Sequence, residues 1–234
     1  VLHGLDFQAE PGTVTALVGP NGSGKTSLLK AIAGTVGHGG RVRFGDHAER
    51  PSEMIGFMPQ DTGGRAALTV FEVILLGRLS RLGMRVSEGD LAAADRAMHD
   101  VGIAHLAERW VGDLSGGQRQ LVHFAQVLAR EPKVLLLDEP TSALDLRNQL
   151  MLLSIIGAQS RARRLTTVVT LHDLNAATRF ADTIAVLHDG RLRRHGPSCE
   201  TIDHGVLAEV WRVEAAIDPA IDGRPSIIPL RSLA

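Results

Sequence analysis

The sequence predicts a single α/β domain with a largely parallel central sheet and an inserted α-helical subdomain. Short apolar runs alternate with helix-compatible segments along most of the 234 residues, a pattern typical of parallel strands joined by helices. One interval departs from this alternation: from Thr69 to about Arg130 the chain is helix-compatible and holds no strand-like run. We therefore expect an α/β core over about 1–65 and 131–234, and a helical subdomain over about 66–130.

The expected elements follow in chain order. Residues 14–19 predict a buried strand, Lys25–Ala33 a helix closed by Gly34, and Ile55–Met58 a second strand. Beyond the helical interval, three apolar runs bounded by polar turns predict further strands, each preceded by a helical pattern. These strands are Lys133–Leu137, Leu165–Leu171 and Thr183–Leu187, and the helices before them are Ser115–Arg130, Leu146–Ser160 and Leu174–Ala181. Residues 218–225 predict a turn-rich lead into a last short strand, Ser226–Pro229.

The composition excludes several classes of protein. Hydrophobic residues make up 44% of the chain, enough to bury a core, and a single cysteine, Cys199, rules out a disulfide framework. The 25 basic and 26 acidic residues nearly cancel, which disfavours an electrostatic grip on nucleic acid. We expect the basic clusters Arg161–Arg164 and Arg191–His195 to be solvated surface. No apolar run approaches the roughly 18 residues of a membrane span.

Residues 19–26, Gly-Pro-Asn-Gly-Ser-Gly-Lys-Thr, fit the phosphate-binding loop and lie between a predicted strand and a predicted helix, as that motif requires. The glycines allow backbone N–H groups to turn inward, and the following helix adds its positive end. Lys25 would contribute a point charge for the β- and γ-phosphates, and Thr26 a hydroxyl ligand for Mg²⁺. The alternative, a glycine-rich turn that binds nothing, is disfavoured by the strand–loop–helix order. The expected nucleotide-binding residues here are Gly19, Pro20, Asn21, Gly22, Ser23, Gly24, Lys25, Thr26 and Ser27.

Two adjacent carboxylates end the apolar run Val134–Leu137. A strand of this kind delivers Asp138 to the carboxyl edge of a parallel sheet, where nucleotide sites of α/β folds lie. We expect Asp138 to hold Mg²⁺, directly or through water, and Glu139 to accept a proton from the attacking water. On their own the two residues could be a solvated turn; paired with the phosphate loop, the catalytic interpretation is favoured.

A second glycine-rich motif, Leu-Ser-Gly-Gly-Gln at residues 114–118, opens a predicted helix. Standing alone, it would be interpreted as an ordinary serine N-cap. Beside a phosphate loop, it offers a second anion-binding helix N-terminus, for which one monomer has no obvious use. A site shared across a two-fold dimer does use it, because Ser115 and Gly117 of each subunit can cap the γ-phosphate held by the partner's Lys25.

Together these motifs make the chain resemble the nucleotide-binding subunit of ATP-binding cassette (ABC) transporters, a P-loop NTPase family, over essentially its whole length. Six elements occur in the family's order. They are the phosphate loop, Gln60 within Gly56–Gln60, the signature at 114–118, Asp138 with Glu139, the loop 142–145, and His172.

The resemblance implies a Mg²⁺-dependent ATPase that works as a homodimer with two ATP molecules sandwiched between its subunits. It implies that Gln60 senses Mg²⁺ and the γ-phosphate, and that His172 contacts the γ-phosphate and helps hold the attacking water. Asp145 would link the two sites across the dimer. The residues it assigns to the nucleotide beyond the phosphate loop are Ser115, Gly116, Gly117, Gln118 and Asp145.

Three segments resemble one branch of the family, the ATPases that energise bacterial uptake of iron chelates, haem and cobalamin. They are Val73–Arg78, Leu171–Asn175 and residues 218–225. The branch implies ferric siderophore import, with haem or cobalamin import as the alternative. It implies integral-membrane permease partners, indirectly a periplasmic or lipoprotein substrate-binding protein, no nucleic acid, and a peripheral place on the cytoplasmic face of the inner membrane.

Other cassette ATPases fit less well. A soluble ATPase of DNA repair would carry a long coiled coil between phosphate loop and signature, but only about 90 positions separate Lys25 from Ser115, and a translation-type relative would carry two cassettes. A non-catalytic nucleotide-binding regulator would not need Glu139, Asp145 and His172.

Two features depart from the family or extend it. The aromatic residue, usually Tyr, that stacks on adenine falls before Val1, and Phe7 lies too far along to replace it, so we expect a missing N-terminal strand and weakened nucleotide binding. Thr69–Leu79 is apolar nearly all round, which indicates burial or a shared surface. Because this segment follows Gln60, we expect Asp61–Arg81 to border a groove for a cytoplasmic helix of a membrane subunit, with Arg65 and Arg78 exposed there.

Overall fold

The computed structural model describes residues 2–45, 54–60, 67–79, 85–142, 144–219 and 223–233. At its centre lies a six-stranded sheet in the order β2-β3-β4-β1-β5-β6. The strands are β1 (Val14–Val18), β2 (Ile55–Met58), β3 (Val134–Leu137), β4 (Thr166–Thr170), β5 (Thr183–His188) and β6 (Arg191–Pro197). All neighbouring strands pair in parallel except β6, which runs antiparallel to β5. The prediction of a largely parallel α/β sheet is confirmed.

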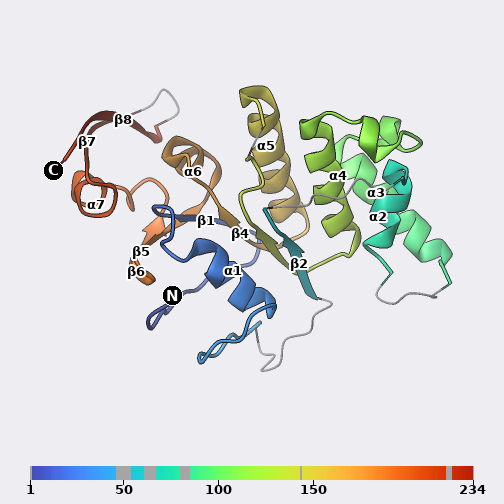
Figure 1. Ribbon diagram of the computed structural model, residues 1–234, viewed down its shortest axis with the longest axis horizontal. Coiled ribbons are helices and arrows are strands. Elements are labelled where there is room, and N and C mark those ends of the chain that lie inside the picture. Colours follow the sequence, from blue (N-terminus) through green and yellow to red (C-terminus); the bar gives the residue numbers. More distant parts are fainter. Residues whose placement is uncertain are drawn as a thin grey trace.

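Helices cover both faces of this sheet, with α1 (Lys25–Ala33) on one and α5 (Leu146–Ala162) and α6 (Leu174–Phe180) on the other (Figure 1). The period of two along each strand sends alternate side chains into two cores. Leu17 packs in the core that contains Leu29 of α1, whereas Val18 lies in the core that contains Leu152 of α5. Burial on both faces explains why these strands are continuous apolar runs in the sequence.

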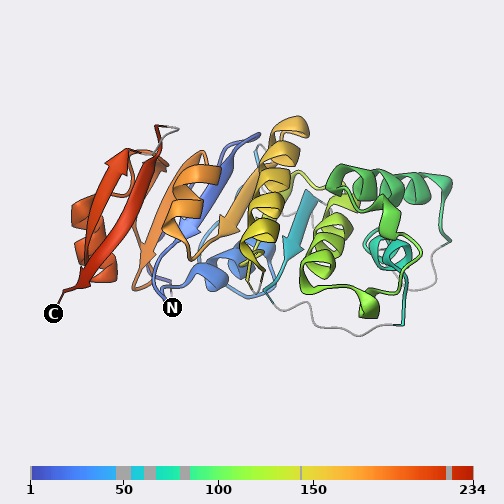
Figure 2. The ribbon, with the colours of Figure 1, turned by 90° about the horizontal axis from the view of Figure 1, so that it is seen from above.

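A group of helices occupies one end of the sheet, beyond β2 (Figure 2). It comprises α2 (Val70–Leu76), α3 (Glu88–Val101), 3₁₀ turns at Ala104–Leu106 and Val111–Asp113, and α4 (Gly116–Ala129). The amphipathic α4 packs against both α2 and α3 and buries Phe124 completely. Among the described residues of this interval, the only extended pairing is an isolated bridge between Thr69 and Trp110, in keeping with the predicted helical character.

Arg78 was expected to be exposed at the docking groove, but the structure shows it largely buried. Its side chain is about three-quarters buried, with Nε 3.1 Å from Asp90 Oδ1 and a terminal nitrogen 3.0 Å from Glu131 Oε2. The side chain therefore joins the end of α2 to α3 and to the turn before β3, and the expectation is wrong because this charge is neutralised inside the chain. Arg65 and the rest of residues 61–66 lie outside the described residues, as do residues 80–84.

The apolar helix α2 is buried on most of its surface. Val70, Val73 and Ile74 are buried, whereas Leu76 is exposed. Packing within the chain thus accounts for most of its apolar character. None of the described helices combines the length and the apolar character needed to cross a membrane.

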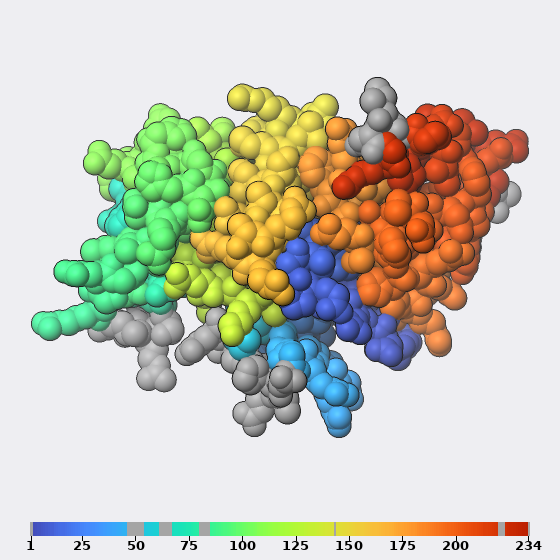
Figure 3. Space-filling model, turned by 180° about the vertical axis from the view of Figure 1, so that it is seen from behind, coloured from blue at the N-terminus to red at the C-terminus, as the bar shows by residue number. Residues whose placement is uncertain are grey.

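The C-terminal residues form a separate antiparallel pair at the other end of the molecule, β7 (Val213–Pro219) with β8 (Pro225–Ser232) (Figure 2). They follow the short helix α7 (His204–Val206) and a π-helical turn, Leu207–Trp211. Seen from behind, α5 lies between the helical group and this C-terminal part (Figure 3). The sequence prediction of a turn-rich lead over 218–225 is partly wrong, because Asp218 pairs with Ser226 and Pro219 with Pro225.

The strands β6 and β7 were not predicted. Strand β6 carries the basic cluster Arg191–His195. Apolar and polar residues do not alternate along it, because it is an edge strand with mostly exposed side chains. Its arginines pair with nearby carboxylates: Arg194 lies 2.9 Å from Asp203 and Arg193 lies 3.6 Å from Glu209. The other cluster sits at the end of α5, where Arg163 contacts Asp100. Both clusters are solvated surface with ion pairs of their own.

One side chain fastens the β7–β8 pair to the sheet domain. Asn175 of α6 donates from Nδ2 to the carbonyl oxygen of Ile227 (3.1 Å) and accepts from its N–H at Oδ1 (2.7 Å). Asn175 thus acts as one more residue in the ladder of β8 and satisfies both polar groups of a residue whose side chain is buried. The segment Leu171–Asn175 is therefore in direct contact with the strand β8.

We expect Asn175→Ala to lower the free energy of unfolding by about 1–3 kcal/mol, because both backbone groups of Ile227 lose their partner. Asn175→Asp keeps an acceptor for the Ile227 N–H but sets a carboxylate oxygen against the Ile227 carbonyl oxygen, so it should not restore the wild-type stability. Urea unfolding measures the stability, and limited proteolysis of the C-terminal strand reports whether β8 detaches. An alanine variant as stable and as protease-resistant as the wild type would contradict this role.

Candidate functional site

The parallel register brings three strand ends to one edge of the sheet. Leu17 of β1 stands opposite Thr170, the last residue of β4, and Leu137, the last residue of β3, stands opposite Val169. The loops that follow these strands therefore start side by side. They carry the glycine-rich loop, the Asp138–Glu139 pair and His172, which explains why residues far apart in sequence meet here.

The glycine-rich loop is fixed by a close approach to β5. Gly19 has φ +150°, and a Cβ atom there would lie 2.0 Å from the carbonyl oxygen of Leu187. Only glycine fits this position. The loop closes on itself through a hydrogen bond from Ser23 N–H to the carbonyl oxygen of Pro20 (3.2 Å), and α1 begins directly after Gly24. Its N-terminus therefore opens into the loop, with no acidic residue in its first turn.

Lys25 is held in this loop with 6% of its surface exposed. Its Nζ donates to the carbonyl oxygens of Gly19 (2.8 Å) and Pro20 (3.0 Å). Burial lowers the pKa of Lys25 from its usual value, while the negative charges of Glu139 and Asp138 act in the opposite direction. The Oγ of Ser23 is buried beside it and has no hydrogen-bond partner among the described residues. A buried lysine and an unpartnered hydroxyl fit a loop that receives an anion such as phosphate.

Asp138 is 1% exposed, so its negative charge depends on hydrogen bonds. Oδ1 accepts from the hydroxyls of Thr170 (2.9 Å) and Thr26 (3.2 Å). A carboxylate beside a hydroxyl offers the oxygen ligands that Mg²⁺ prefers. Among the described residues no three His, Cys, Asp or Glu side chains gather into a metal site. The donor set therefore suits a metal that takes its remaining ligands from phosphate and water.

Glu139 joins the other two predicted catalytic residues. Its Oε2 accepts from Gln60 Nε2 at 2.7 Å, and its Oε1 lies 2.5 Å from His172 Nε2. The backbone of Glu139 is left-handed, with φ +49°, which is uncommon for a residue other than glycine and marks a constrained position. The structure thus brings Lys25, Thr26, Gln60, Asp138, Glu139 and His172 into one cluster.

The signature residues stand in a second group. Ser115 caps α4, since its Oγ accepts from Gln118 N–H (3.3 Å) and Gln118 Oε1 accepts from Ser115 N–H (3.1 Å). Asp145 likewise caps α5 by accepting from Asn148 N–H at 2.8 Å. Ser115, Gly116 and Asp145 are exposed, whereas Gly117 is buried against Asn148. Ala143, between the two caps, lies outside the described residues.

These two groups are not brought together within one chain. The hydrogen bonds of Ser115 stay within the first turn of α4, and β2 lies between α1 and α4 in Figures 1 and 2. A bond from Gln120 Nε2 to the carbonyl oxygen of Pro140 (2.7 Å) connects α4 with the segment after Glu139. Among the contacts that the structure describes, none joins Ser115 to the cluster around Lys25.

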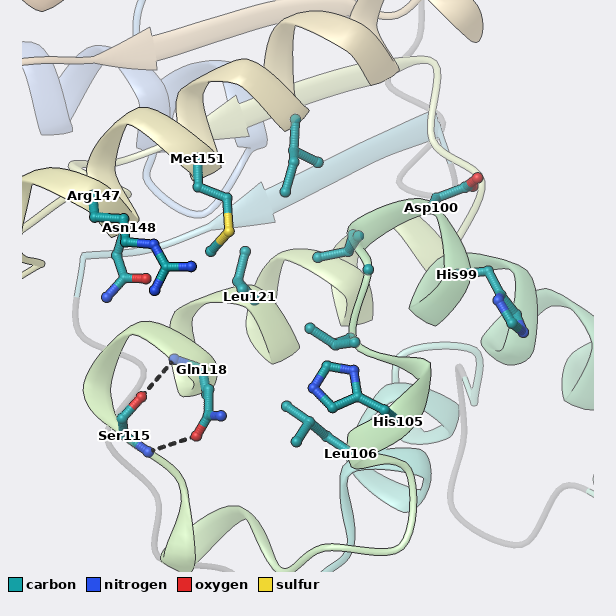
Figure 4. A pocket seen from close by; sticks show the side chains of 14 residues that line it. His99, Asp100, His105, Leu106, Ser115, Gln118, Leu121, Arg147, Asn148 and Met151 are labelled. Atoms are coloured by element: carbon teal, nitrogen blue, oxygen red, sulfur yellow. Dashed lines mark hydrogen bonds between the residues drawn. The ribbon is translucent and has the colours of Figure 1, made fainter.

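A pocket of about 640 Å³ opens beside the signature residues rather than at the glycine-rich loop. Figure 4 shows Ser115 and Gln118 of α4 on one side, Arg147, Asn148 and Met151 of α5 on another, and His105 opposite them. No residue of the Lys25 cluster lines it. The hollow is a feature of the junction between α5 and the helical group.

Sequence reasoning missed Thr170. Its hydroxyl contacts both carboxylate residues that follow β3, since it donates to Asp138 Oδ1 and accepts from Glu139 N–H at 2.7 Å. A threonine that ends an apolar strand two residues before His172 is the only signal the sequence offers. The contact itself depends on the β3–β4 register.

Comparison with known proteins places the chain among ABC transporter proteins. Residues 2–142 match the family model of the ABC transporter. The hemin import ATP-binding protein HmuV of Rhodopseudomonas palustris is 39% identical over 241 residues, which cover 96% of this chain and 87% of that protein. The ferric enterobactin transport ATP-binding protein FepC of Escherichia coli is 34% identical over 240 residues, covering 98% and 89% of the two chains.

Solved structures give the same result for the fold. The chain superposes on a metal-chelate type ABC transporter in an inward-facing conformation with a TM-score of 0.80 and 29% identity, covering 94% of this chain and 88% of that one. The ATP-binding cassette MJ1267 in its ADP conformation gives a TM-score of 0.76 at 25% identity, with 84% of each chain covered.

Proposed function

The chain belongs to the ABC transporter family of ATP-binding proteins, and from that membership we propose that it is the ATP-hydrolysing subunit of a bacterial importer for an iron chelate or haem. The observation that carries the proposal is the cluster at the strand ends. A buried lysine in a glycine-rich loop, a hydroxyl–carboxylate pair and a glutamate held by glutamine and histidine lie within one network. This is the set of groups that phosphoryl transfer from ATP to water requires.

Within this site each residue has a distinct task. Lys25 and the backbone N–H groups of residues 19–26 would bind the β- and γ-phosphates. Thr26 and Asp138 would hold Mg²⁺, which when bound neutralises phosphate charge. Glu139 would accept a proton from the attacking water, and its position between Gln60 and His172 supports this role because both neighbours orient the carboxylate. Gln60 and His172 would then serve as sensors of the γ-phosphate.

A second copy of the chain would complete the site. Ser115 and Gly116 are exposed at the N-terminus of the 14-residue helix α4, whose positive end suits a phosphate. In a two-fold dimer this end would face the nucleotide held by the partner's loop, and Asp145 would lie at the same interface. ATP would close the homodimer and hydrolysis would reopen it.

The dimer would drive integral-membrane permease subunits from the cytoplasmic face, with a substrate-binding protein delivering the cargo outside. The segment after Gln60 remains the proposed docking region. Leu76 of this segment is an apolar residue with an exposed side chain. Of the two cargo classes, ferric siderophore is supported by the similarity to FepC, and haem by the similarity to HmuV, whose identity to this chain is the higher.

Glu139→Gln should lower ATP turnover by about 10²-fold or more while ATP remains bound, because the amide cannot accept the water proton. Phosphate release from the purified protein with its permease measures turnover, and a filter assay with labelled ATP measures retention. Glu200→Gln, an exposed change on the C-terminal side, is the matched control and should turn over normally. Near-normal turnover of the Glu139 variant would remove this residue as the base.

Two inactive variants should restore activity when mixed. Lys25→Ala removes the positive charge that would bind phosphate, and Ser115→Arg blocks the signature end of α4. A homodimer of either variant therefore has no complete site. Random reassociation gives mixed dimers with one intact site, and we expect about a quarter of the wild-type rate. A mixture that stays inactive, or a wild-type rate per molecule that does not change on dilution, would contradict the shared site.

Growth under iron starvation distinguishes the two cargoes. In a strain deleted for this chain, the wild-type protein should restore growth on one iron source, haem or a ferric siderophore, and the Glu139→Gln variant should restore neither. Uptake of radiolabelled iron in the two forms measures the preference directly. Equal iron uptake with and without the chain would contradict the importer function.

A further inference from the structure

We propose that Thr170 is a positioning residue that sets the relation between the metal-binding carboxylate Asp138 and the base Glu139. The inference rests on the proposed ATPase function and adds a residue that neither the motifs nor the comparisons assign. Thr170 has no exposed surface, so it acts through its neighbours rather than on the substrate.

The hydrogen-bond directions at Thr170 follow from the chemistry of its partners. The Glu139 N–H can only donate, and it lies 2.7 Å from Thr170 Oγ1, so the hydroxyl oxygen accepts there. The hydroxyl proton is then free for Asp138 Oδ1, at 2.9 Å. One hydroxyl therefore accepts from the backbone of one carboxylate residue and donates to the side chain of the other.

The bridge through Thr170 contacts a constrained position of the backbone, Glu139. Glu139 adopts φ +49°, a conformation that persists in a non-glycine residue only when its surroundings fix it. The bond to its N–H is the contact that holds this peptide against β4. Because the chain runs from the end of β4 through Leu171 to His172, the same strand end places the imidazole 2.5 Å from the Glu139 carboxylate.

The bridge also bears on the carboxylate that would hold Mg²⁺. Asp138 Oδ1 accepts from two hydroxyls, Thr170 and Thr26, and Thr26 is the one expected to ligate Mg²⁺. Thr170 is thus the hydroxyl that holds the carboxylate from the side of the sheet. Partners of this kind, which orient a metal ligand without touching the metal, typically change metal affinity or activity by 10–100-fold when removed.

The test compares three variants on the same strand. Thr170→Val keeps the shape and removes the hydroxyl, Thr170→Ser keeps the hydroxyl, and Thr167→Val removes another fully buried hydroxyl, one that bonds Ser160 instead of the site. We expect Thr170→Val to lower kcat by about 10–100-fold, with Thr170→Ser and Thr167→Val within about threefold of wild type.

A binding measurement separates positioning from general damage. ATP affinity measured with EDTA should be equal in all variants, whereas the gain in affinity on adding Mg²⁺ should shrink about tenfold only in Thr170→Val. Thermal unfolding checks that the two valine variants lose comparable stability. A Thr170→Val protein that matches Thr167→Val in kcat and in its Mg²⁺ response overturns the inference, as does a serine variant that is as impaired as the valine one.

The outcome is distinct from failure of the proposed function. If the wild-type chain with its permease releases no phosphate, the ATPase proposal fails. If the wild type is active, Glu139→Gln is inactive and Thr170→Val is normal, only the role of Thr170 fails.

Discussion

The parallel register of β3, β4 and β1 is the constraint on which the rest of this structure depends. It aligns Leu137 with Val169 and Leu17 with Thr170, so that three loops leave the sheet at one level. A register shift of one residue would turn every side chain to the opposite face, which the two buried cores forbid. The hydrophobic pattern of the strands thereby fixes the chemistry at their ends to within a residue.

Burying charge at this edge is costly, and the site compensates with local hydrogen bonds. Lys25 donates hydrogen bonds to two carbonyl oxygens of the loop, and Asp138 accepts hydrogen bonds from two threonine hydroxyls. The compensation is incomplete at Lys25, whose pKa is lowered by burial, and at Ser23 Oγ, which has no partner among the described residues. These incomplete contacts are the physical reason why the loop is suited to an anion.

The division of the site into two groups has the same origin. The glycine-rich loop follows a strand of the sheet, whereas the signature follows the helical group beyond β2. Each of these two motifs lies at the N-terminus of a helix, but the two helices belong to different layers. Ser115 makes its hydrogen bonds to Gln118, within the first turn of its own helix. The ion pair between Arg78 and Glu131 connects the end of α2 with the turn before β3.

The sequence alone determined the parallel sheet, the helical interval and the bounds of α1 and β2, because apolar runs and glycine-rich loops are local signals. It also singled out the residues that the structure gathers around Lys25. It did not reveal β6 and β7, whose polar or mixed residues become strands only through pairing with β5 and β8. From the sequence, Arg78 was predicted to be exposed. Its ion pair with Glu131 could not be predicted, because the two residues are 53 positions apart and no local pattern links them. Thr170 and Asn175 likewise gained their contacts from strand register and from the docking of β8, which only the tertiary structure decides.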